Sequence, residues 1–384
     1  MKKSRIIHIC LAVAIMAAVP YFVFARKTRS VTHRGNTTVI IENDCVEEEE
    51  TEKSDDRSTR RTVKKVGSFH SVVCEGPIEL IFKPGKAGDI KITGSQNVVK
   101  NVKVINRNGV LTLSYSRKDR YSRRNINRDD CDVKIYCSTP DLQGVTLKMS
   151  ASFTTSKPLI TRNDFSLDLS TASEFRAPVV KCDQFRATSM SASELKIDRV
   201  EANDFIIDLY SASEFKITTV LCDKNCDIRT NSASEFSAQT LSAPLCRLTC
   251  TSASETKIGT VTTSTAQISS QSSATVDITG MLNCSDNGFA TVTASSTGTL
   301  TVNDLNADVV ELTSTSSATS TLRSIQCKTF RSVVSTYASA TLEGKASRAL
   351  FTASTGGEIY ATKFHAKKVT VEKNSSCKVK LDSD

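Results

Sequence analysis

Short runs of alternating apolar and polar positions begin near residue 63. Ile78, Leu80 and Phe82 occupy alternate positions, and a period of two over four to eight residues is typical of a half-buried β-strand. Further alternating sets are Ile90 and Ile92, Val102 and Val104, Leu111, Leu113 and Tyr115, and Val133, Ile135 and Cys137. Turn residues separate the runs, among them Asn108-Gly109, a pair that two-residue hairpins favour. The pattern predicts an all-β protein.

An internal repeat begins at residue 150. The sequence Ser/Thr-Ala-Ser-Glu recurs so that its glutamates are spaced by 20, 20, 21 and 20 residues. These glutamates are Glu174, Glu194, Glu214, Glu235 and Glu255. Degenerate copies occupy 150–153, 272–276, 316–319 and 337–341. A constant interval of this length predicts a solenoid.

The content of each repeat indicates which kind of solenoid is formed. The runs 165–169 and 205–209 alternate as strands do, whereas leucine-rich and helical repeats need Leu/Asn patterns or longer periods. At about 3.3 Å per residue, a coil of about 20 residues has a perimeter near 66 Å, enough for two or three short strands. The sequence therefore predicts a parallel β-helix with coils of about 20 residues.

Stacking these coils assigns an inside and an outside to the repeat. The residues after the glutamates should form one interior column, because equivalent positions lie above one another. This column is Phe175, Leu195, Phe215, Phe236, Thr256 and Val276. The glutamates should then form an outer ladder beside a basic row, since neighbouring side chains point to opposite faces. The basic row is Arg176, Lys196, Lys216 and Lys257.

The glutamate ladder has two interpretations. In the structural one, the basic row offsets the repulsion between carboxylates, and the Ser and Ala residues fit a tight corner with hydroxyl hydrogen bonds between coils. In the functional one, the oxygen-rich row binds calcium or a basic ligand. The structural interpretation needs no ligand and is preferred, so we expect neither a metal nor a cofactor.

The N-terminus indicates export. A basic start precedes an apolar stretch from Ile6 to Ala25 with small residues near its end, as in a secretory signal peptide. The alternative is an uncleaved anchor, because twenty apolar residues could span a bilayer and basic residues follow at 26–29. Membrane contact is then expected only through residues 6–25. The localisation follows as periplasm, outer membrane surface or secreted.

Three segments are predicted from these patterns. Residues 1–25 form the signal or anchor, 26–62 a charged disordered linker, and 63–384 one β-helix domain, with irregular coils over 63–149 and regular coils over 150–384. The linker contains the acidic run Glu47–Glu50, for which metal binding is the alternative to a solvated spacer. Cleavage after Ala25 would reduce the net charge from +9 to +6, which weakens an interpretation based on nucleic-acid binding.

Thirteen cysteines allow disulfides in an exported protein. Cys226 and Cys246 both lie nine residues before a glutamate, so they should stack in adjacent coils within bonding distance. Cys182 and Cys222 share a register position but lie two coils apart. Buried thiols or one Cys226–Cys246 disulfide are preferred over zinc binding. Cysteines on a strand are oriented differently from the cysteines in the turn of a zinc knuckle.

Residues that could carry catalysis are sparse. The four histidines are far apart in the sequence, so a Ser-His-Asp or Cys-His site is not indicated. A basic run between Tyr115 and Cys131 reads most simply as a charged loop, with binding of an acidic glycan or lipid headgroup as the alternative. Its arginines are Arg117, Arg120, Arg123, Arg124 and Arg128. We expect no catalytic residues.

Several segments resemble a known family. They are Val66–Gly85 (VGSFHSVVCEGPIELIFKPG), Ile90–Gly94, Asn108–Leu113 and the Ser-Ala-Ser coils. Together they resemble the head GIN domain of putative autotransporter adhesins, from about Val63 to the C-terminus. The resemblance implies a right-handed β-helix with an export signal, of a type common in Bacteroidetes. It implies no catalytic residues.

Two functions remain open. The first is a non-enzymatic adhesin or binding scaffold at the cell envelope that contacts a glycan or a protein. The second is a polysaccharide lyase or hydrolase, because β-helices host both activities. Such enzymes need clustered aspartates with a basic residue in a groove built by long loops. The nearly uniform, short-looped coils favour the binding protein.

Overall fold

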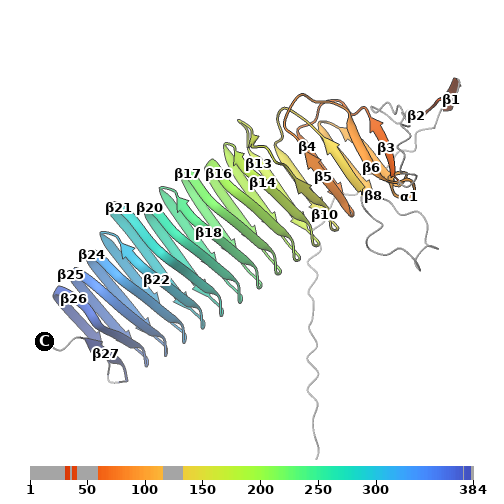
Figure 1. Ribbon diagram of the computed structural model, residues 1–384. Helices are drawn as coiled ribbons and strands as arrows, with labels where there is room; N and C mark the ends of the chain where they lie inside the picture. Colours follow the sequence, from red (N-terminus) through yellow and green to blue (C-terminus); the bar gives the residue numbers. More distant parts are fainter. Residues whose placement is uncertain (1–30, 35–36, 41–58, 116–132, 375, 382–384) are drawn as a thin grey trace, which may run out of the picture.

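The chain forms a long stack of parallel strands that ends at the C-terminus (Figure 1). The computed structural model describes residues 31–34, 37–40, 59–115, 133–374 and 376–381. β1 (Val31–Arg34) and β2 (Thr37–Ile40) form a small antiparallel sheet. The other described strands belong to one continuous hydrogen-bonded sheet. The predicted β-solenoid with coils of about 20 residues is confirmed.

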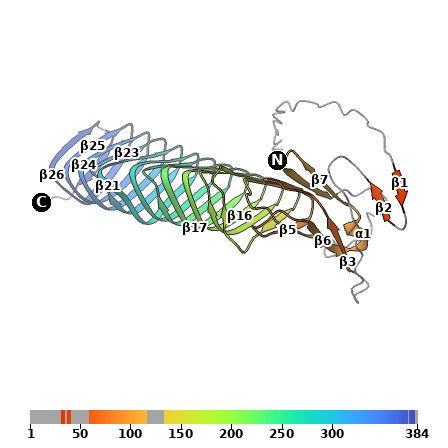
Figure 2. The same ribbon diagram turned by 90° about the horizontal axis from the view of Figure 1, so that it is seen from above.

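The N-terminal part combines parallel coils with antiparallel strands. Its elements are β3 (Thr59–Lys64), β4 (Ser71–Glu75), β5 (Ile78–Phe82), β6 (Ile90–Ser95), α1 (Gln96–Val99), β7 (Val102–Arg107), β8 (Val110–Tyr115) and β9 (Val133–Cys137). β4 lies parallel between β8 and β10, and β5 lies parallel between β9 and β11. β3, β6 and β7 join by antiparallel pairing, at the end of the solenoid opposite the C-terminus (Figure 2). They cover strand edges that would otherwise be open to pairing with another chain.

The β7–β8 hairpin turns at Asn108 and Gly109. Arg107 pairs with Val110, and both turn residues have positive φ, 52° and 75°. This is the two-residue turn that the Asn-Gly pair predicts. The alternating residues listed from the sequence lie in β5 to β9, and almost all are buried. The interpretation of these runs as strands is confirmed.

The regular coils follow from β10 to β27. Their strands are β10 (Gly144–Lys148), β11 (Ser152–Thr154), β12 (Leu159–Ile160), β13 (Phe165–Ser170), β14 (Glu174–Lys181), β15 (Gln184–Ser189), β16 (Glu194–Leu209), β17 (Glu214–Thr230), β18 (Glu235–Ser242), β19 (Leu245–Cys250), β20 (Glu255–Gln271), β21 (Thr275–Ser295), β22 (Thr299–Asn306), β23 (Val309–Ser314), β24 (Thr319–Ser335), β25 (Ser339–Ser354), β26 (Glu358–Lys373) and β27 (Lys378–Leu381). A coil such as 194–213 contains paired stretches at 194–197, 199–202 and 204–209. Bends and a corner separate these stretches.

The Ser-Ala-Ser sequence forms the corner of the coils in which it recurs. Ser211 and Ala212 both adopt left-handed backbone conformations, with φ of 55° and 60°, which costs about 1–2 kcal/mol per non-glycine residue. The Ala212 N–H donates to the carbonyl of Ser232 in the next coil (3.0 Å). The next serine is buried, and its hydroxyl bonds carbonyls of its own corner and of the preceding coil, as Ser213 does with Tyr210 and Ser189. The predicted hydroxyl bonding between coils is confirmed.

Interior side chains form columns along the solenoid axis. The predicted column from Phe175 to Val276 is in register and almost completely buried. A second column stacks Phe165, Phe185 and Phe205, whose neighbouring ring centroids are 6.0 and 5.3 Å apart. Cys226 and Cys246 continue this second column. The core is a narrow column filled by aliphatic residues, Phe and Cys, which explains how the chain folds without tryptophan.

Candidate functional site

The predicted glutamate ladder lies on the outer surface. Glu174, Glu194, Glu214, Glu235 and Glu255 pair in register from β14 to β20, and none is buried. Glu174 forms an ion pair with Arg176, and Glu214 with Lys216. The Glu214 hydrogen bond and charge, with smaller contributions from Glu235 and Glu194, raise the pKa of Lys216. The basic row therefore offsets the carboxylate row, as the structural interpretation expects.

A groove of about 400 Å³ runs beside this ladder. Lys196, Lys216 and Lys257 line it together with main chain at the bend of each coil. Gly259 is required there, because a Cβ at this position would lie 2.4 Å from the carbonyl oxygen of Gln239. These lysines stand beside the row of glutamates, so the net charge around the groove is largely balanced.

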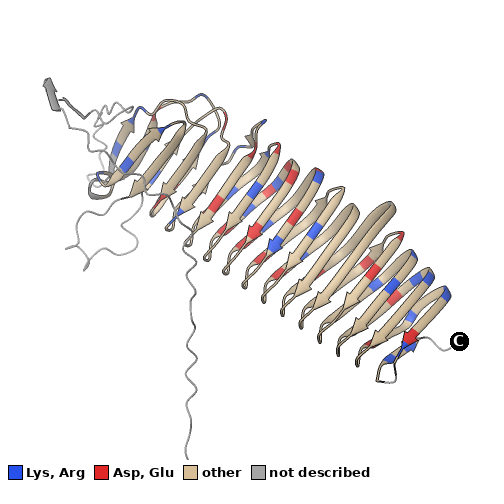
Figure 3. Ribbon diagram, turned by 180° about the vertical axis from the view of Figure 1, so that it is seen from behind, with Lys and Arg blue, Asp and Glu red and all other residues tan. Residues whose placement is uncertain are grey.

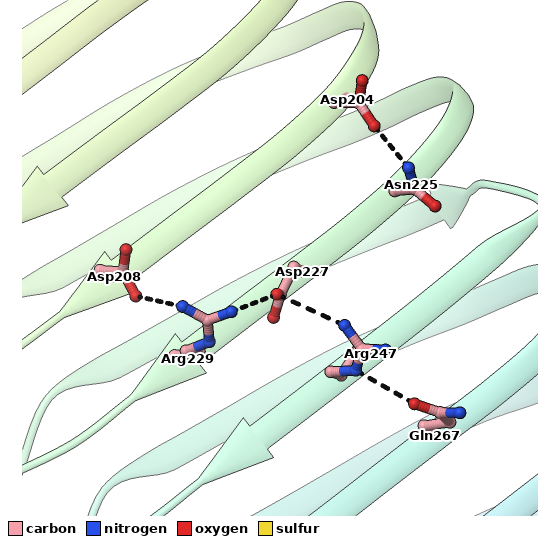
Figure 4. Close-up of polar contacts among 7 residues, drawn as sticks. All are labelled: Asp204, Asp208, Asn225, Asp227, Arg229, Arg247 and Gln267. Atoms are coloured by element: carbon pink, nitrogen blue, oxygen red, sulfur yellow. Dashed lines mark hydrogen bonds and ion pairs between the residues drawn. The ribbon is translucent and has the colours of Figure 1, made fainter.

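A second polar network covers the face formed by β16, β17, β19 and β20 (Figure 4). Arg229 reaches Asp208 of the preceding coil (3.4 Å) and also bonds Asp227. Arg247 lies 3.7 Å from Asp227 and donates its Nε–H to Gln267 (3.0 Å). The two aspartates are only 14% exposed, and each is neutralised by an arginine.

Polar contacts between adjacent coils recur at the repeat interval. Each joins a basic residue of one coil to a carboxylate of its neighbour about 20 residues away. These ion pairs are Lys181–Glu201, Arg229–Asp208, Arg247–Asp227, Lys328–Asp308, Arg331–Glu311 and Lys363–Glu343. Exposed pairs of this kind contribute little individually, but the rigid backbone holds them in fixed rows. The surface is therefore a preorganised polar lattice.

Eight of the described cysteines are buried. Cys226 and Cys246 pair directly across β17 and β19, which confirms their predicted stacking, and both are free thiols in the structure. Burial raises the pKa of Cys182 to about 12 and that of Cys226 well above its usual value. Within the described ranges, no three His, Cys, Asp or Glu side chains converge in a way that could hold a metal ion.

Other predicted sites lie outside the described residues. These are the basic patch of Arg117, Arg120, Arg123, Arg124 and Arg128, the acidic run of the linker and the signal segment. In the part of the chain that the structure describes, no helix has the length and hydropathy needed to cross a membrane.

Sequence reasoning missed a groove of about 630 Å³ on the C-terminal coils. Its lining includes Lys328, Lys345, His365 and Lys367 beside small residues. The signal was in the charge distribution: residues 321–381 contain 11 Lys and Arg against 3 Asp and Glu. Only two charged residues occur over 259–303, so nearly uncharged coils separate the basic end from the glutamate ladder (Figure 3).

The fold and surface define a β-solenoid with a repetitive polar exterior. The family model of the putative auto-transporter adhesin head GIN domain matches residues 68–281 and 285–384. The chain belongs to this family, which confirms the resemblance found in the sequence. No curated protein sequence matches the chain.

Solved structures similar to the chain include bacterial proteins described as putative adhesins and one described as a putative lipid binding protein. A putative adhesin from Parabacteroides merdae is 10% identical, with a TM-score of 0.35 over 83% of this chain and 97% of that chain. One from Parabacteroides distasonis is 9% identical, with a TM-score of 0.36 over 85% and 98%. A putative lipid binding protein from the same species is 10% identical, with a TM-score of 0.35 over 84% and 97%.

Proposed function

We propose that the protein is an exported, non-enzymatic adhesin that binds an extended partner, a glycan, along its outer surface. The observation that supports this most is the row of ionic side chains repeated at the coil interval, as in Arg229 with Asp208 and Lys363 with Glu343. Neighbouring coils present similar groups about 4.8 Å apart. A rigid, periodic surface suits a polymer that is itself periodic, because little conformational entropy is lost on binding.

Membership of the adhesin family supports the same function. Asp208 and Asp227, on neighbouring coils, are bonded to arginines on a sheet face. Neither residue lines one of the grooves described above. Their arrangement suits a structural lattice better than a site with a free acid and a free base.

A glycan array tests this function. We expect the purified full chain to retain specific glycans, with equal binding in calcium and in chelator because the ladder needs no metal. The same incubations are analysed for released oligosaccharides by mass spectrometry. Release of products would overturn the non-enzymatic proposal and favour the lyase or hydrolase. Absence of binding to every glycan would overturn the glycan partner.

Export is tested on the protein from its own cell. We expect the mature chain to start at Arg26, since the small residues before Ala25 form the cleavage site. N-terminal sequencing of the cell-surface fraction measures this. A surface protein that starts at Met1 would instead support the anchor.

A further inference from the structure

The groove on the C-terminal coils lies along successive coils at one corner. It is formed where β24, β25 and β26 pass from one face to the next, and its floor includes Ala307, Ala346 and Ala366. Cys327 completes this floor, and burial raises the pKa of its thiol to about 12, so the group is neutral. The floor therefore consists of small, uncharged groups. Its edges carry basic side chains and one carboxylate, Asp308, which is paired with Lys328 at 2.6 Å.

Basic residues are stacked directly on one another in this groove and next to it. Lys345 pairs in register with His365, and Arg348 with Lys368, on β25 and β26. All four side chains are exposed. Within the described ranges, Lys345, Arg348 and Lys368 form no ion pair with a carboxylate. Neighbouring like charges in a sheet are destabilising. Arg176, Lys196 and Lys216 also stack on one another, but each stands two residues after a ladder glutamate, which Arg348 and Lys368 do not.

Protection of an open strand edge does not explain this charge. β27 covers only residues 358–361 of β26, so the lysines at the end of β26 can act against edge pairing, as charged edge residues do. Lys345 and Arg348, however, belong to β25, which is paired on both sides by β24 and β26. Protection of an edge therefore does not account for the charge of Lys345 and Arg348.

A row of amides leads into the cationic positions. Asn283, Asn306 and Gln326 occupy the same column as Lys345 and His365 on successive coils. Asn306 donates to Asn283 (2.9 Å), which orients the amides along the axis. Amides hydrogen-bond to hydroxyl groups, and lysine and arginine bind sulfate or carboxylate groups. The column thus offers both kinds of contact that an acidic sugar chain requires.

We propose that this groove binds a polyanionic glycan that carries sulfate or carboxylate groups, with the chain running along the solenoid axis over β22, β24, β25 and β26. This deepens the proposed adhesin function and rests on it. The lining contains no large apolar side chain to enter a bilayer and no Phe, Tyr or Trp ring to stack on a nucleic-acid base. A sugar chain is therefore favoured over both a lipid surface and a nucleic acid.

The test compares two double variants with equal loss of charge. The site variant is Lys345→Gln/Arg348→Gln, which leaves the edge strand β26 unchanged. The control is Lys196→Gln/Lys257→Gln, because these lysines also line a groove but stand among glutamates. Circular dichroism and thermal unfolding confirm that both variants fold. The probes are heparin, polygalacturonate, neutral dextran and vesicles containing phosphatidylglycerol, measured with the full chain by calorimetry.

We expect heparin or polygalacturonate to bind and added NaCl to weaken binding, because the charges are exposed to screening. The site variant should lose about tenfold in affinity and the control less than about threefold. Equal losses in both variants, or none in either, would overturn the site. Binding of dextran without the polyanions would overturn the inference and leave the adhesin function standing. Binding of vesicles alone would show a lipid site instead. Absence of binding to every polysaccharide here and on the array would overturn the glycan partner of the proposed function as well as this site.

Discussion

The hydroxyl of Ser213 lies 3.0 Å from the carbonyl oxygen of Ser189, in the preceding coil. It also lies 2.8 Å from the carbonyl of Tyr210 within its own corner. Ser254 repeats the relationship with Thr230 and Thr251 at 2.9 and 2.6 Å. The carbonyls of Ser189 and Thr230 also accept backbone N–H groups from Tyr210 and Thr251. The repeated serine therefore adds a side-chain hydrogen bond between coils to the backbone bonds and also bonds a carbonyl of its own corner.

Removing this hydroxyl should destabilise the solenoid moderately. We expect Ser213→Ala to lower the free energy of unfolding by about 1 kcal/mol, since one buried hydrogen bond is lost. Alanine fits the space, because Ala274 and Ala318 occupy equivalent corners and are buried. Urea denaturation measures the change. Ser237→Ala, on an outer strand position, is the control and should be nearly neutral; an equal loss there would contradict the role of the corner.

The left-handed corner residues predict a stabilising change. Ala212 has φ of 60°, a conformation that glycine adopts without strain. We expect Ala212→Gly to raise the free energy of unfolding by up to about 1 kcal/mol, and Ala212→Val to lower it by more than that, because a β-branched residue is disfavoured there. Thermal unfolding distinguishes the two. Similar melting temperatures for both variants would show that backbone strain at the corner is unimportant.

The inside and outside of the repeat can be separated by two neighbouring substitutions. Phe215 is completely buried, so Phe215→Asp removes the ring and buries a charge, which should cost about 4 kcal/mol or more and unfold the coils. Glu214 is on the outer face in an exposed pair with Lys216, so Glu214→Ala should cost less than about 1 kcal/mol. Circular dichroism and the melting temperature measure both. A larger effect at Glu214 would reverse the assignment.

The stacked cysteines predict a disulfide under oxidation. In-register parallel neighbours are about 4.8 Å apart, which lies within the Cα separation that disulfides allow. We expect mild oxidation with diamide to join Cys226 to Cys246, and the closed loop of 20 residues to add about 3 kcal/mol. Peptide mapping by mass spectrometry identifies the bond. Cys246→Ala is the control, and a bond that forms with another partner in the unsubstituted chain would contradict the prediction.

The buried thiols predict loss of stability at alkaline pH. Burial raises the pKa of Cys74 and of Cys182 to about 12, from 9.0. A raised pKa in the folded state gives stability that is complete below pH 9 and is lost as the pH rises toward 12, because the unfolded thiol ionises first. Each thiol should contribute about 1.4 kcal/mol per pH unit in that range.

Urea denaturation between pH 8 and pH 11 measures this slope. Cys182→Ala should reduce the slope of the unfolding free energy against pH by the contribution of one thiol. Ser237→Ala should leave this slope unchanged. Parallel curves for the unsubstituted chain and Cys182→Ala would show that this thiol ionises as readily in the folded protein as in the unfolded one.

Residue periodicity predicted much of this architecture. The interval between glutamates determines which residues stack, and the alternation around them determines which face is buried, because a strand has a side-chain period of two. Both the Phe column and the Cys226–Cys246 register follow from these two facts. The groove at Lys345 could not be predicted in this way. The groove depends on how neighbouring faces of one coil meet at a bend. The repeated sequence motif marks the corner and not this bend.

The sequence by itself determined the repeat, its strands, the buried column and the outward glutamates, because these depend only on local periods that the backbone imposes. The tertiary structure alone decided how the antiparallel strands β3, β6 and β7 close the N-terminal end. It also decided which residues line the groove on the C-terminal coils. The antiparallel contacts join residues that no constant interval relates, and the groove depends on how the faces of a coil meet, so only the folded stack reveals them.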